Sequence, residues 1–265
     1  MISIDSAQID AWIVAFIFPL SRILGFIATA PLWSSNGVPR RVRLVLGLAI
    51  TIALTPSLTP SLPPMPAVQP ASLGGLWIMA QQLLIGVGMG FAVKIVFTAF
   101  HMAGEFIGTQ MGLGFATFYD PLNSAQTPVV AEFLNLLALL LFLSMNGHLL
   151  YLATLAQSFT AIPVSATPLG AGSWLNLAEL GSKMFSAGLL LSLPIVAALM
   201  ITNVALAVLT RAAPQLNLFA LGFPLTLMGG FFALAVSLNY MATPIQGIFE
   251  LGMEAMLGYV VPARP

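Results

Sequence analysis

The residues best suited to chemistry in this chain are few, and the clearest pair is His101 and Glu105. These residues lie four positions apart in a predicted helix, so they would share one face, and His101 could then serve as a metal ligand. His148 is the only other histidine, and it lies far along the chain from this pair. The sequence contains no HExxH motif. We therefore expect neither a metal ion nor another cofactor.

A second candidate for catalysis is the dipeptide Tyr119-Asp120, which is similar to one half of the dyad of an intramembrane aspartyl protease. Such a dyad needs two carboxyl groups that share a proton. Asp5 and Asp10 precede the first apolar segment, so neither can supply the second group at membrane depth. No serine lies in a GxSxG motif, and the chain has no cysteine. These patterns predict a protein that is not an enzyme and leave an intramembrane hydrolase as the weakest alternative.

The composition indicates what must hold these residues in place. The chain has 265 residues, of which 59% are hydrophobic and 6% charged, whereas roughly a quarter of the residues of a soluble domain are charged. Most of the surface must therefore face lipid or other apolar protein. The formal net charge is zero, which argues against nucleic acid as a partner.

Hydrophobic runs predict an all-α membrane protein with a single domain over residues 1–265. A spanning helix needs about 20 mostly apolar residues. Six segments approach that length, and a weaker amphipathic stretch follows at 245–261; the six are 11–33, 42–58, 76–100, 129–154, 184–209 and 218–242.

Prolines lie both between and within these segments. Six prolines lie between 56 and 70, which predicts an extended linker. Pro194 and Pro224 lie inside the last two segments, so we expect those helices to be kinked or broken. The segment 129–154 contains no proline and is expected to be continuous.

Ionisable residues near the segments can form ion pairs, can form a proton relay, or can snorkel to the membrane surface. Arg22 is central to its segment, so we expect it to have a buried partner. Lys94 and Glu132 lie near segment ends, where snorkelling is the simpler interpretation. Glu105 and Arg211 complete the set of candidate buried or interfacial charges.

Glycine spacing predicts close helix packing. Gly86, Gly88 and Gly90 lie in the third segment, and glycine then recurs every fourth residue at Gly104, Gly108 and Gly112. Residues spaced in this way share one helical face, and small residues let helix backbones approach closely in lipid. The sequence predicts that these last three glycines form one packing face within the chain or between subunits.

The stretch 111–128 is rich in glycine and proline, which disfavours a helix, and too apolar for a solvated loop. Irregular backbone at membrane depth is tolerated only inside protein or along a cavity. Apolar side chains there would suit a plug or constriction, and methionine adapts to varied shapes. The predicted plug or gate residues are Met111, Gly112, Leu113, Gly114, Phe115, Phe118, Asp120 and Pro121.

Three motifs together resemble the FliR/SctT family of type III secretion export-gate subunits, and the similarity covers nearly the whole chain. The first is Arg22-Ile-Leu-Gly25 with Pro31, and the second is Gly104-x3-Gly108-x2-Met111-Gly112. The most specific is Arg211-Ala-Ala-Pro214-Gln215-Leu-Asn217, which runs into Phe219 and Gly222-Phe223-Pro224. Leu225 and Thr226 follow that proline, which favours the flagellar branch over the virulence branch.

The resemblance implies a non-enzymatic subunit of the flagellar export gate in the bacterial inner membrane, at the flagellar basal body. It implies kinked helical hairpins, partners of the FliP and FliQ families, further export-apparatus proteins, and unfolded protein substrates in transit. It also implies that the loop from Met111 to about Thr127 helps to plug the closed channel. The main alternative is a stand-alone secondary transporter with a binding site at its broken helices. Against that alternative, two related halves are not visible in the sequence.

Overall fold

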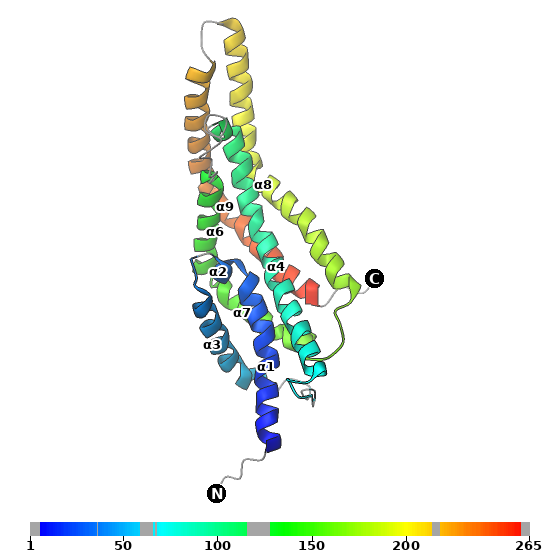
Figure 1. Ribbon diagram of the computed structural model, residues 1–265. Helices are drawn as coiled ribbons and strands as arrows, with labels where there is room; N and C mark the ends of the chain where they lie inside the picture. The colour runs from blue at the N-terminus through cyan, green and yellow to red at the C-terminus, as the bar shows by residue number, and fades with distance from the viewer. Residues whose placement is uncertain are drawn as a thin grey trace. The chain divides into compact units, whose positions relative to one another are not determined.

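The computed structural model describes residues 6–35, 37–58, 66, 68–115, 128–213 and 218–260. Within these ranges the chain is helical and contains no strand (Figure 1). The elements, in chain order, are α1 (Ser6–Thr29), α2 (Pro31–Ser34), α3 (Arg40–Leu58), α4 (Leu73–Gln110), the 3-10 turn η1 (Leu113–Phe115), α6 (Val129–Ser144), α7 (Gly147–Ala161), α8 (Ala171–Ala212) and α9 (Leu218–Val260).

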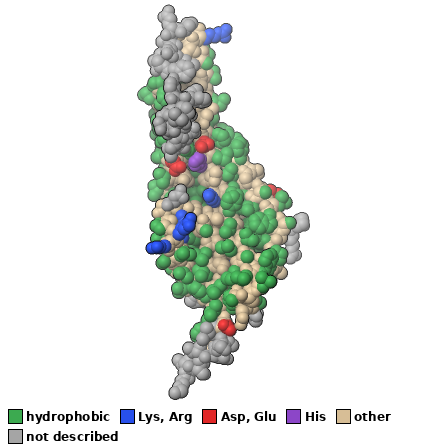
Figure 2. Space-filling view, viewed as in Figure 1, with side chains coloured by type: hydrophobic (Ala, Val, Ile, Leu, Met, Phe, Trp, Pro, Cys, Tyr) green, Lys and Arg blue, Asp and Glu red, His purple; other side chains and the backbone are tan. Residues whose placement is uncertain are grey.

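Among the described residues, four helical stretches are long and apolar enough to cross a membrane. They are Asp10–Thr29, Leu73–Gln110, Ala171–Ala212 and Gly222–Val260, and the bent pair α6 and α7 adds a fifth if it is one span. The predicted all-α membrane fold is thus confirmed. Hydrophobic side chains also dominate the face drawn in Figure 2.

Two of the predicted segments, 42–58 and 129–154, need correction. The segment 42–58 corresponds to α3, which is not among the candidate spans, and its first turn carries three of the chain's arginines. The segment 129–154 is not continuous, because α6 ends at Ser144 and Asn146 adopts a left-handed φ of 57°. Asparagine tolerates this conformation better than most residues, so it can end one helix and begin the next.

The prolines of the last two spans do not interrupt them. Pro194 lies inside α8, and Pro224 and Pro244 lie inside α9. The predicted segments 218–242 and 245–261 therefore form one helix. All three prolines lie at exposed positions, and neither helix ends at them. Most of the predicted linker 56–70 lies outside the described residues, and α3 continues to Leu58.

The chain divides into two compact units. Unit 1 contains residues 1–95, 146–181 and 250–265, and unit 2 contains residues 96–145 and 182–249. In unit 1, α1 packs along the first part of α4, as the dark-blue and cyan helices show in Figure 1. Its core includes the fully buried side chains of Phe18, Phe26 and Met89.

The core of unit 2 is an aromatic cluster from three helices. Phe97 and Phe100 come from α4, Phe142 from α6 and Phe249 from α9. The ring centroid of Phe249 lies 5.4, 5.6 and 5.1 Å from those of Phe97, Phe100 and Phe142, respectively. These separations are in the range at which aromatic pairs attract one another.

Candidate functional site

The most distinctive site in unit 1 is the fully buried side chain of Arg22, in the middle of α1. Its Nε and Nη2 both donate to Oε1 of Gln82 on α4, over 2.9 and 2.5 Å. Nη1 donates to the backbone oxygen and to Oγ of Ser158, over 2.9 and 3.1 Å, and Nη2 also donates to the oxygen of Ile162 over 2.8 Å. A guanidinium group carries five N–H donors, so these five hydrogen bonds can occupy all of them.

The charge of Arg22 is balanced without a carboxylate among the described residues. Two of its acceptors are carbonyls at the C-terminal end of α7, Ser158 and Ile162, where the helix dipole is negative. The ring of Phe159 lies 4.2 Å from the guanidinium carbon and adds a cation–π contact. Oγ of Ser158 donates to the oxygen of Leu155 over 2.6 Å, which leaves its lone pairs for Arg22. The site therefore fastens the end of α7 to α1 and α4.

The other predicted charges are not buried. Lys94 is exposed on α4 within unit 1. In unit 2, Glu105, Glu132 and Arg211 are exposed, on α4, α6 and α8 respectively. A role for these four residues at an interface stays a prediction.

In unit 1, glycines allow α4 to pack closely against α1 and the end of α9. A Cβ atom on Gly86 would clash with the backbone of Arg22, and one on Gly90 would clash with the side chain of Thr29. The hydroxyl of Thr29 donates to the backbone oxygen of Val87 over 3.1 Å. Gly88 instead leaves room for the ring of Tyr259 near the end of α9. The first three glycines of the predicted packing series thus lie at contacts within the chain.

The three glycines at fourfold spacing do not behave alike. A Cβ atom on Gly104 would overlap the backbone of Ala131, so α4 and α6 cross there in close contact. At Gly108 the nearest atoms, on Leu113 and Val130, would be at least 3.8 Å from an added Cβ, which is ordinary contact. Gly112 lies beyond the end of α4 with a φ of 83°, so it does not share their helical face. The prediction of one three-glycine face is wrong in this respect, because α4 ends at Gln110.

The predicted plug begins in the described part of unit 2. Met111 is fully buried, and its backbone oxygen accepts a hydrogen bond from the hydroxyl of Thr226 over 3.2 Å. Its side chain lies against Gly230 of α9, where an added Cβ would be 2.5 Å from Cγ of Met111. Leu113 and Gly114 continue into η1, which ends at Phe115. Met111 therefore anchors the start of this loop on α9.

Several predicted residues lie outside the described residues. Phe118, Asp120 and Pro121 of the predicted plug belong to this group, as do Pro214, Gln215 and Asn217 of the family motif. Gly222 and Pro224 of the same motif lie in the first part of α9.

Catalytic and metal-binding arrangements find no support in the described part of the chain. Nδ1 of His101 and Oε1 of Glu105 lie 3.8 Å apart as an i, i+4 pair. No group of three or more His, Asp or Glu side chains there could hold a metal ion. What the described geometry can do is hold helices together.

Gln82 and Tyr259 were not predicted from the sequence. The signal for Gln82 was present, because Gln81 and Gln82 are adjacent polar residues in an apolar segment and both prove buried. Gln81 donates to the oxygen of Ala166 over 2.9 Å. Asn176, near the start of α8, donates to the oxygen of Gly258 over 2.8 Å, next to Tyr259.

Comparison of the sequence with known proteins shows the family to which the chain belongs. A family model described as "Bacterial export proteins, family 1" matches residues 13–252. The flagellar biosynthetic protein FliR of Escherichia coli (strain K12) is 42% identical over 252 residues, which cover 94% of each chain. FliR of Pectobacterium carotovorum subsp. carotovorum is 42% identical over 90% of this chain and 89% of its own. FliR of Bacillus subtilis (strain 168) is 31% identical over 91% of this chain and 93% of its own.

Proposed function

This chain belongs to family 1 of the bacterial export proteins and is a membrane component of the flagellar export apparatus, and from that premise we propose that it is a non-enzymatic subunit of the type III export gate. In this role it helps to form and to close the conduit through which unfolded flagellar proteins cross the inner membrane. The observation that carries the proposal is the family match over residues 13–252, nearly the whole of the chain. The described geometry agrees with it, since its buried polar site joins helices and offers no free reactive group.

Uncovered apolar faces on two helices support assembly with other membrane subunits. The best spanning window of α4 is 61% buried within the chain, whereas those of α8 and α9 are only 28% and 22% buried. Between residues 189 and 209 of α8, every exposed residue is apolar, and the same holds between 223 and 236 of α9. Lipid or apolar protein must cover such faces. We assign them to contacts with FliP- and FliQ-family subunits.

The loop that begins at Met111 is the proposed closure of the conduit. Its first residue is buried against α9, so the loop starts from a fixed point in unit 2. The residues that follow are apolar or glycine as far as Ala116. An apolar constriction can exclude water and ions until it is displaced.

The proposal is tested by export in living cells. The gene is deleted in its own flagellated bacterium, and the flagellar proteins released into the medium are measured together with their levels inside the cell. We expect release to stop while the substrates remain in the cytoplasm, and we expect a plasmid copy of the wild-type gene to restore it. Unchanged release in the deletion strain would contradict the proposal.

A further inference from the structure

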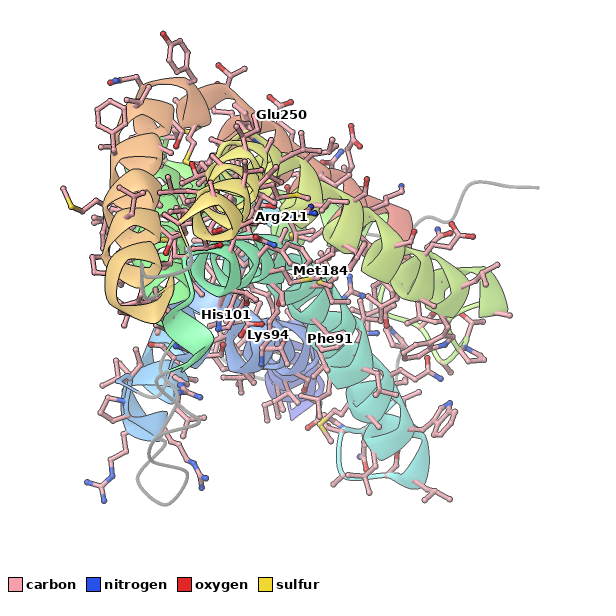
Figure 3. All side chains as sticks on the ribbon, turned by 90° about the horizontal axis from the view of Figure 1, so that it is seen from above. Phe91, Lys94, His101, Met184, Arg211 and Glu250 are labelled. Carbon is pink, nitrogen blue, oxygen red and sulfur yellow. The ribbon has the colours of Figure 1, made fainter. Side chains whose placement is uncertain are left out.

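The uncovered face of α4 in unit 2 differs from every long uncovered face described above, because it is polar. Within residues 96–110 all exposed residues are polar, namely Thr98, Glu105 and Thr109. His101, labelled in Figure 3, lies between them with 38% of its side chain exposed. The spacings of three or four residues place all four on one side of the helix. We call these four residues the α4 polar seam.

The α4 polar seam is not built to face lipid. It occupies the last part of α4, which is one of the helical stretches long and apolar enough to cross a membrane. A charged side chain such as that of Glu105 is costly in contact with the hydrocarbon of a bilayer. By contrast, the exposed residues of α8 between 189 and 209 and those of α9 between 223 and 236 are all apolar.

The seam also lacks the features of a contact with an oppositely charged helix. Its one carboxylate, on Glu105, lies 3.8 Å from Nδ1 of His101 of the same seam, and the seam contains no Lys or Arg. The remaining members are two threonine hydroxyls, which can donate and accept hydrogen bonds. Every exposed side chain of the seam can therefore form hydrogen bonds with water or with a polypeptide backbone.

We propose that the α4 polar seam is a wall of the conduit and contacts unfolded polypeptide in transit, an inference that rests on the export-gate function proposed above. An unfolded chain carries an unpaired N–H and C=O at nearly every residue, so its path must supply water or hydrogen-bonding groups. The seam supplies hydrogen-bonding groups at each of its exposed positions. It ends at Thr109, two residues before Met111, so the polar path leads to the start of the loop proposed to close it.

Site-specific crosslinking in the assembled complex tests this proposal. A photoreactive amino acid is placed at Thr98, Glu105 or Thr109, and an export substrate is stalled in the gate by a tightly folded domain fused to its C-terminus. Ile201 and Val208, exposed on the apolar face of α8, are the matched control positions. We expect adducts with the stalled substrate from the seam positions and none from the two controls.

Thiol labelling gives a second measurement with milder substitutions. Because the chain has no cysteine, Thr98→Cys and Thr109→Cys each introduce a single thiol that is nearly isosteric with threonine. No other cysteine of this chain can then react with the labelling reagent. We expect a charged, water-soluble thiol reagent to modify both in the assembled complex, and we expect the stalled substrate to abolish the reaction. Ile201→Cys should stay unmodified in either state.

Two results separate the seam from the function on which it rests. If the cysteine variants support export but show neither substrate adducts nor protection by the substrate, the seam proposal is wrong and the export-gate function stands. If export is unaffected when the whole chain is absent, both proposals fall together.

Discussion

Nε and Nη2 of Arg22 both donate to the single side-chain oxygen of Gln82, over 2.9 and 2.5 Å, although the two residues are 60 positions apart on different helices. The same guanidinium group reaches two carbonyls at the end of α7. One buried cation thus ties together α1, α4 and α7 in unit 1. If a substitution removed one of these acceptors, the N–H donor of Arg22 would remain buried without a partner. The resulting loss of stability can be measured.

Gln82→Leu should destabilise unit 1. The change leaves two N–H groups of Arg22 without an acceptor, and an unpaired buried donor costs about 1–3 kcal/mol. We expect a lower thermal unfolding midpoint, measured by tryptophan fluorescence on the purified assembled complex. Gln82→Glu keeps an acceptor at the same place and should be close to wild type. Gln246→Leu, at an exposed position of α9, is the control. Equal midpoints for Gln82→Leu and Gln246→Leu would show that the buried hydrogen bonds contribute little.

Gly104→Ala and Gly108→Ala form a matched pair on α4. At Gly104 the new methyl group would overlap the backbone of Ala131, and overpacking of this kind costs about 1–3 kcal/mol. At Gly108 the space accepts a methyl group, and alanine favours a helix over glycine by about 1 kcal/mol. The yield of assembled complex and its unfolding midpoint should fall for Gly104→Ala and hold or rise for Gly108→Ala. The same loss in both variants would argue against the close crossing of α4 and α6 at Ala131.

Gly88 and Tyr259 should show energetic coupling. The ring of Tyr259 occupies the position that a side chain on Gly88 would need, and its hydroxyl lies 3.4 Å from the oxygen of Leu84. Gly88→Ala should therefore be harmful in the wild-type chain and less harmful when Tyr259→Leu has removed the ring. A double-mutant cycle on the unfolding midpoint measures this difference. Strictly additive effects would mean that the ring does not fill that space.

Removal of residues 113–118 should open the resting gate. This deletion keeps Met111 and its contacts with Thr226 and Gly230, so the end of α4 retains its anchor. We expect a higher ion conductance across membranes that contain the assembled complex, since the apolar closure is lost. The control is a replacement of the same six residues by an apolar sequence of equal length. Conductance unchanged by the deletion would remove the plug from the proposal.

Much of the fold could be predicted from the sequence, because lipid imposes long apolar helices. The hydrophobic runs located α1, α4, α8 and α9, and Gly104 marked a close helix crossing. Helix breaks were harder to predict, because a helix can accommodate a proline and can also break without one. Pro194 and Pro224 predicted kinks or breaks, and the helices that contain them are continuous. The break at Asn146 has no proline next to it.

The polar partners of Arg22 could not be predicted in the same way. Its position in the middle of an apolar segment indicated a buried partner, and acidic residues were the natural candidates. The structure uses Gln82 and two backbone carbonyls instead. Backbone carbonyls occur at every position in a sequence, so only the folded arrangement of α7 reveals which of them accept these hydrogen bonds.

Native mass spectrometry of the tagged chain, gently extracted after co-expression with its FliP- and FliQ-family neighbours, tests the assignment to a hetero-oligomeric gate. The uncovered apolar faces of α8 and α9 predict a defined complex in which this chain is bound to several copies of those small membrane proteins. A stable monomer, or an oligomer of this chain alone that forms with the neighbours present, would contradict that assignment.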